Sequence, residues 1–178
     1  MKTPFPLLLS LALLASCAQQ SPRPESPQRE AALLTHPVLL YRGLKVVAGT
    51  TNEIDWTKSS FGVSGQPSTL SLFDNILVSP HIPCWLEITV DVPGVPPPVH
   101  GVTGDLAIPN PPPGGANAGP WPVVFDNAPP GHWSIAQATI GGTSNTQASI
   151  RAAAVFSAMA QAPAPTATVV DGSANGCH

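Results

Sequence analysis

Proline and glycine constrain the fold of this chain more than any other residue types, because 23 prolines and 15 glycines are spread along its 178 residues. Proline has no backbone N–H to donate, and glycine weakens the interior of a helix. This composition favours short extended strands joined by turns over long helices. Hydrophobic residues make up 43% of the chain, which is enough to bury a core. We therefore expect a mainly β protein whose length suits one domain.

The clearest strand is predicted over residues 85–92. Apolar side chains occupy every second position of this segment, and polar side chains occupy the positions between them. The apolar positions are Leu86, Ile88, Val90 and Val92, and the polar positions are Glu87, Thr89 and Asp91. A period of two places the two sets on opposite faces of a strand, so we expect one face in the core and the other in water.

Shorter runs of β-forming residues predict further strands. They lie at 38–41, 44–47, 69–78, 99–108 and 123–125, and the aliphatic pair at 169–170 allows one last strand. A Pro-Pro-Gly turn at 129–131 leads into an alternating segment from His132 to Ile140. Gly141 and Gly142 follow it and predict a tight hairpin turn, because glycine readily adopts positive φ.

Residues 127–143 resemble the late hairpin of immunoglobulin-like and transthyretin-like modules, in which a Pro-Gly-aromatic start opens a strand that ends in a glycine turn. The resemblance implies a single immunoglobulin-like β-sandwich, which we expect residues 33–178 to form. The alanine-rich segment 148–162 fits one short helix near the carboxyl terminus, yet its apolar residues also alternate as in a strand. The pattern leaves both structures open for this segment.

The amino terminus has the features of an export signal. Lys2 supplies a positive charge, and an apolar run extends from Leu7 to Ala15. The run ends in Leu14-Ala15-Ser16-Cys17, which resembles the lipobox of bacterial lipoproteins. The resemblance implies cleavage before Cys17, removal of residues 1–16 as a signal peptide, and transfer of lipid to the Cys17 thiol. The alternative is an ordinary cleaved signal in which Cys17 lies near the cut by chance.

Residues 17–32 are expected to form the lipidated cysteine and a disordered tether rich in Pro, Gln and Ser, because almost no apolar residue is present to repay the entropy of ordering. Two or three acyl chains would hold such a protein firmly to a membrane. The expected location is therefore the bacterial cell envelope. By analogy with the lipoprotein family, Ala18 after the cysteine implies the outer membrane in bacteria that have two membranes.

The charges argue against a nucleic-acid partner. The formal net charge is −3 and only 10% of the residues are charged. The basic residues are scattered, so no cluster of lysine and arginine is available to neutralise phosphates or to grip anionic lipid. Attachment to a membrane is expected to come from the lipid on Cys17.

Cys84 and Cys177 remain once Cys17 carries lipid, and an even pair of cysteines in an oxidising compartment favours a disulfide. The alternative is an envelope enzyme or metal-binding protein that uses Cys84 and the histidines. In the enzyme, Cys84 would be the nucleophile and His81 its base, although residues three apart on an extended segment point to opposite faces. His81, His100, His132 and His178 do not have the spacing of a recognised zinc site, so we expect neither a metal nor another cofactor.

Tryptophan supplies the remaining candidate for binding. Core packing is expected for Trp85 and Trp133, whereas Trp121 lies between Pro120 and Pro122 and is the best candidate for an exposed binding surface. We find no catalytic motif and predict a lipid-anchored, non-catalytic binding or structural module of the envelope. Its expected partners are the membrane, through the anchor, and an envelope protein or polysaccharide.

Overall fold

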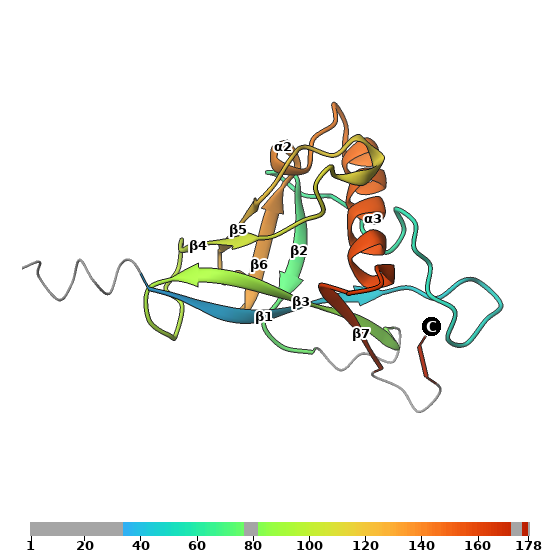
Figure 1. Ribbon diagram of the computed structural model, residues 1–178, viewed down its shortest axis with the longest axis horizontal. Coiled ribbons are helices and arrows are strands. Elements are labelled where there is room, and N and C mark those ends of the chain that lie inside the picture. Colours follow the sequence, from blue (N-terminus) through green and yellow to red (C-terminus); the bar gives the residue numbers. More distant parts are fainter. Residues whose placement is uncertain (1–33, 77–81, 172–175, 178) are drawn as a thin grey trace, which may run out of the picture.

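The computed structural model describes residues 34–76, 82–171 and 176–177 (Figure 1). Seven strands and three helical segments follow one another within these ranges. In chain order they are β1 (Thr35–Leu44), β2 (Thr69–Phe73), β3 (Cys84–Pro93), β4 (Thr103–Leu106), η1 (Pro113–Gly115), β5 (Trp121–Phe125), β6 (His132–Ala136), α2 (Gln137–Ile140), α3 (Asn145–Gln161) and β7 (Ala167–Asp171). Among the described residues, no helix has the length and apolar character needed to cross a membrane.

Six of the strands close into an antiparallel barrel in the order β1-β2-β6-β5-β4-β3. The ring closes through β1 and β3, which pair over their full length from Thr35 opposite Pro93 to Leu44 opposite Cys84. The other edge of β3 is shared, because β7 pairs with its first half and β4 with its second half. β7 is therefore an additional strand outside the six-stranded ring.

The expectation of an immunoglobulin-like sandwich is wrong, because the strands form one closed barrel. Alternating apolar and polar residues predict a half-buried strand in either architecture. What distinguishes the two is the pairing of β1 with β3, which removes the free edges that two separate sheets would keep. That pairing joins residues about fifty positions apart, and no local pattern reports it.

The predicted strand over 85–92 is confirmed as β3. Its apolar positions are buried, whereas Thr89 and Asp91 are exposed. The first strand differs from the expectation of two short runs, because β1 continues through Arg42 and Gly43 to Leu44. Gly43 permits this passage, since a Cβ at that position would lie 2.7 Å from Cγ2 of Ile82.

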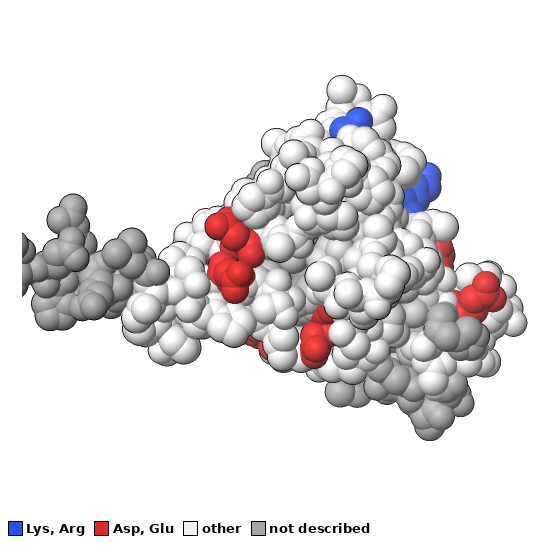
Figure 2. All heavy atoms as spheres, in the orientation of Figure 1, with Lys and Arg blue, Asp and Glu red and all other residues white. Residues whose placement is uncertain are grey.

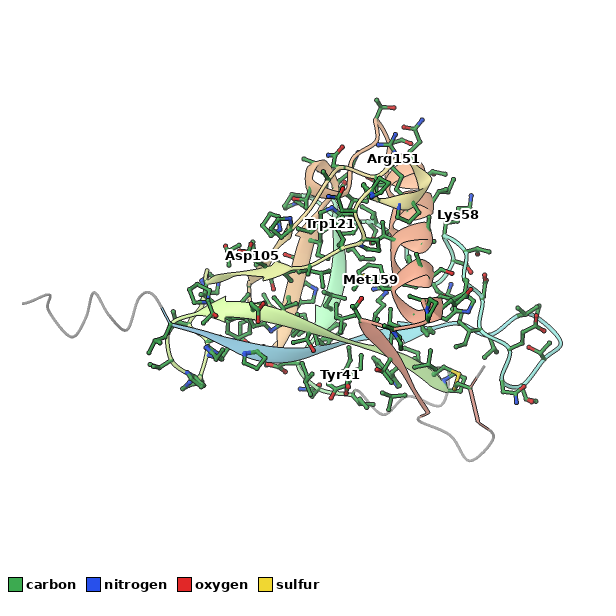
Figure 3. The ribbon with its side chains drawn as sticks, in the orientation of Figure 1. Tyr41, Lys58, Asp105, Trp121, Arg151 and Met159 are labelled. Atoms are coloured by element: carbon green, nitrogen blue, oxygen red, sulfur yellow. A yellow bond between two sulfur atoms is a disulfide. The ribbon has the colours of Figure 1, made fainter. Side chains whose placement is uncertain are left out.

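The alanine-rich segment is a helix, α3, which settles the question left open by its pattern. The hydroxyl of Ser144 accepts a hydrogen bond from the backbone N–H of Gln147 and caps its first turn. One face of the helix covers the end of the barrel at which β5 begins, and the ring of Phe156 packs between Phe61 and Trp121. Figure 3 shows Trp121 and Met159 in the space between the strands and α3.

The hairpin predicted at Gly141 and Gly142 is absent, although the Pro-Pro-Gly turn does lead into β6. β6 ends at Ala136, and the next four residues form α2 instead of extending the strand. Gly141 and Gly142 have φ values of 91° and 105°, and they turn the chain from α2 into α3. The glycines therefore make a sharp turn as expected, but they join two helices.

Candidate functional site

Cys84 and Cys177 form the predicted disulfide, with 5.9 Å between their Cα atoms. The bond connects the start of β3 to the segment after β7. Because the thiol of Cys84 is used in this bond, it is not a nucleophile. His81, its proposed base, lies outside the described residues, as do Cys17, the tether and His178.

The histidines of the described residues do not converge on Cys84. His100 is exposed in the loop after β3, whereas Cys84 begins that ten-residue strand. Nδ1 of His36 lies 2.9 Å from the carbonyl oxygen of Gly94 and ties the start of β1 to the same loop. Within the described ranges, no three side chains of His, Cys, Asp or Glu are grouped as metal ligands.

Trp121 is fully buried, so the expectation of an exposed binding surface there is wrong. It begins β5, and the alternation of this strand points residues 121, 123 and 125 inward while Pro122 is exposed. The indole Nε1 donates to the carbonyl oxygen of Asn117 at 3.0 Å, which satisfies its polar atom. The flanking prolines predicted a loop, but β5 still pairs with β4, with Pro122 opposite Asp105, and it pairs with β6 only from Val124 onward. Trp85 and Trp133 are buried as predicted.

His132 and Asp126 form the one ion pair among the described side chains, with 2.5 Å between Nδ1 and Oδ1. Asp126 follows β5 directly and His132 begins β6, so the pair spans the turn between these strands. The backbone of Asn127 donates to the carbonyl oxygen of His132, and Gly131 donates to Oδ1 of Asn127 at 2.8 Å. Edge-on contact with Phe73 completes the surroundings of the imidazole. These contacts indicate that the pair stabilises the tight turn between β5 and β6.

A hollow of about 440 Å³ opens where the end of β1 meets the end of β2 and the start of β3. Its wall is mostly apolar, with two basic side chains in it. The lining residues are Arg42, Gly43, Leu44, Lys45, Ser59, Ser60, Phe73, Ile82 and Trp85. Small-molecule sites are commonly apolar cavities of a few hundred Å³ with a few polar groups that orient the ligand.

Arg42 is the unusual residue of this hollow. It occupies the inward face of β1 between Leu40 and Leu44, which are both fully buried, while Tyr41 projects from the outer face (Figure 3). Its Nε donates to the carbonyl oxygen of Ser60 and its Nη1 to that of Ser71, each at 2.9 Å. Arginine has five N–H donors, so these two bonds leave donors for a ligand.

The guanidinium of Arg42 has no carboxylate partner in the described part of the chain. Burial lowers its pKa to about 10, and it therefore stays charged at neutral pH. Lys45 adds a second positive charge at the rim, although the nearby carboxylate of Asp55 offsets it. An unpaired cation beside an apolar wall suits a molecule that has both an anionic group and an apolar body.

In the sequence, Arg42 is one of the scattered basic residues and lies between the strands expected at 38–41 and 44–47. A signal was present nevertheless, because Leu40, Arg42 and Leu44 occupy alternate positions and share one face of any strand through them. This spacing places Arg42 on the inward face only because β1 continues through Gly43 to Leu44. The other residues that line the hollow include members of β2, β3 and the loop at 59–60, and no sequence motif connects them.

The fold and the hollow together define a small closed β-barrel with an apolar hollow beside the ends of β1 and β2, lined by Arg42, which has no carboxylate partner among the described residues. No protein-family model matches the chain, and neither the curated proteins nor the solved structures contain a significant match to it.

Proposed function

We propose that this chain is a lipid-anchored protein of the bacterial envelope whose barrel binds, without catalysis, a small apolar molecule that carries an acidic group. The observation that supports it best is the guanidinium of Arg42, which lines an apolar hollow and is paired with no carboxylate of the described residues. An anionic group on a ligand would complete the hydrogen bonding of Arg42, and the ligand's apolar part would contact Trp85, Phe73 and Ile82. The lipobox at Leu14-Ala15-Ser16-Cys17 supports the anchor.

Binding of decanoate tests the proposed ligand class, with decanol as a neutral molecule of the same chain length. The mature chain from Ala18, made without lipid, avoids detergent in the measurement. Trp85 lines the hollow, so its fluorescence reports occupancy. We expect decanoate to bind about tenfold more tightly than decanol, because a hydrogen bond to a charged group contributes more than one to a neutral group.

Arg42→Met should abolish the preference for decanoate, since methionine keeps the apolar volume and removes the charge. Arg151→Met is the matched control, because it removes an arginine of α3 that does not line the hollow. Equal binding of decanoate and decanol by the wild-type chain would refute the proposed ligand class. An unchanged preference in Arg42→Met would do the same.

The anchor is tested separately by the intact mass of protein extracted from membranes. We expect the mass of a chain cut before Cys17 plus the mass of its acyl groups. The Cys17→Ser variant should lose these groups and leave the envelope fraction. A mature protein without added fatty mass would refute the anchor and leave the hollow unaffected.

A further inference from the structure

One end of the barrel gathers the start of the folded chain and two loops. β1 begins at this end, which we call the N-terminal end, and β3 and β5 finish there. The loop of residues 94–102 joins β3 to β4, and the turn of residues 127–131 joins β5 to β6. Gly94 donates its N–H to the carbonyl oxygen of Leu34 at 2.8 Å, and Gly101 donates to that of Phe125 at 2.7 Å. These bonds fix the first loop to both neighbouring strand ends.

The part of this end formed by Leu34 and the loop 94–102 is uncharged and partly apolar, whereas the carboxylates of Asp74 and Asp126 flank the turn 127–131. The loop 94–102 contains no Asp, Glu, Lys or Arg. Three of the six exposed large hydrophobic side chains of the described residues lie here, namely Leu34 at 58%, Val95 at 66% and Val99 at 71% exposure. Figure 2 shows this end, at the left, without charged side chains at its tip, and the nearest acidic side chains are set back from it. Isolated exposed valines are ordinary, but three apolar side chains on one uncharged tip form a patch.

The proposed anchor joins the chain at this same end. Cys17 precedes Leu34 by 17 residues, which span at most about 60 Å when fully extended. Leu34 is the first described residue and belongs to the patch. The apolar tip is therefore the part of the barrel that is nearest to the lipidated cysteine along the chain.

We infer that the N-terminal end of the barrel rests on the lipid bilayer, with Leu34, Val95 and Val99 inserted among the lipid head groups. This inference rests on the proposed lipid anchor. Apolar side chains gain free energy at the boundary between head groups and acyl chains, and the absence of charged residues in the loop 94–102 removes the cost of desolvating ions there. Since the loops contain no lysine or arginine, the contact does not depend on anionic lipid.

The proposed orientation of the barrel on the bilayer determines where the hollow lies relative to the membrane. Arg42 lies seven residues beyond Thr35 on β1, which corresponds to roughly 23 Å along the strand. The hollow therefore lies along β1 away from the tip formed by Leu34 and the loop 94–102. Its ligand would be taken up from solution and not directly from the bilayer.

The test places a tryptophan on each end of the full lipidated protein. Val99→Trp labels the apolar tip, and Val47→Trp labels an exposed valine in the β1–β2 loop at the other end. The proteins are reconstituted in phosphatidylcholine vesicles with or without brominated acyl chains, which quench only nearby indoles. We expect the added quenching to be at least about twofold stronger for Val99→Trp, because inserted side chains lie within about 5–10 Å of the acyl boundary.

The outcomes separate the inference from the anchor. If both variants float with the vesicles and their added quenching is equal, the inference is overturned and the anchor stands. If the wild-type protein with its lipid does not float with the vesicles, the anchor fails and the inference fails with it. Stronger quenching of Val99→Trp in floating protein supports the inference.

Discussion

Asp126 holds the imidazole of His132 across the turn between β5 and β6, with its Oδ1 2.5 Å from the ring Nδ1. Burial acts to raise the pKa of the Asp126 carboxyl, but hydrogen bonds from His132, the backbone of Ala128 and Ser134 outweigh it, and the pKa is lowered. As the pH falls, the unfolded chain therefore takes up a proton at this carboxyl before the folded protein does. The resulting stabilisation is present above the unfolded pKa and is lost as the pH falls through the folded pKa.

We expect Asp126→Asn to lower the free energy of unfolding by about 1 kcal/mol at pH 7, a modest value because the carboxylate is partly exposed. The difference from the wild type should shrink as the pH falls below about 4, because protonation then weakens the same contact in the wild type. Urea unfolding over this pH range measures both effects. Glu53→Gln, which removes an exposed carboxylate in the β1–β2 loop, is the control. A difference that is constant with pH would contradict the role of the charged form.

Asp91 and Asp105 lie directly opposite each other on β3 and β4, and both are exposed. Like charges in facing positions of an antiparallel pair are destabilising, so Asp105→Asn should raise the free energy of unfolding by about 0.5 kcal/mol at low salt. Asp91→Asn should give a similar gain, and the double variant little more, because either change removes the same repulsion. Added salt should shrink the gain in urea unfolding experiments, and additive gains would argue against a direct interaction.

The disulfide joins positions that are 93 residues apart. Closing so long a loop restricts the unfolded chain, so replacing both cysteines by alanine should lower the free energy of unfolding by about 3–5 kcal/mol. Chemical denaturation of the variant and of the wild type, each with and without a thiol reductant, measures the effect. Reduction should destabilise only the wild type. A loss below about 1 kcal/mol would show that the tail after β7 is held in place without the bond.

Phe156 fixes α3 to the end of the barrel, because its ring centroid lies 5.4 Å from that of Phe61 and 6.2 Å from that of Trp121. Phe156→Ala should cost about 3–5 kcal/mol of unfolding free energy through lost burial and the cavity that remains. Ile150→Ala on the same helix should change it by less than about 0.5 kcal/mol, since Ile150 is 52% exposed. Similar losses for the two variants in thermal unfolding would contradict the packing of α3.

The candidate site could be predicted from the sequence less well than the strands could. The spacing of Leu40, Arg42 and Leu44 was visible in the sequence, but its meaning required β1 to continue through Gly43. The expected exposure of Trp121 failed because Pro120 and Pro122 report local backbone preference and not which side of a strand is covered. α3 covers that position from more than twenty residues further along the chain.

The sequence by itself determined that the chain is mainly β and which face of β3 is apolar, because alternation and proline content act over a few residues. It also predicted that Cys84 and Cys177 pair, as the structure shows. Only the tertiary structure decided that β1 closes the ring against β3 and that segment 148–162 is a helix. The reason is physical: an apolar face requires cover, but several partners satisfy that requirement equally well. The choice among them depends on packing over the whole chain.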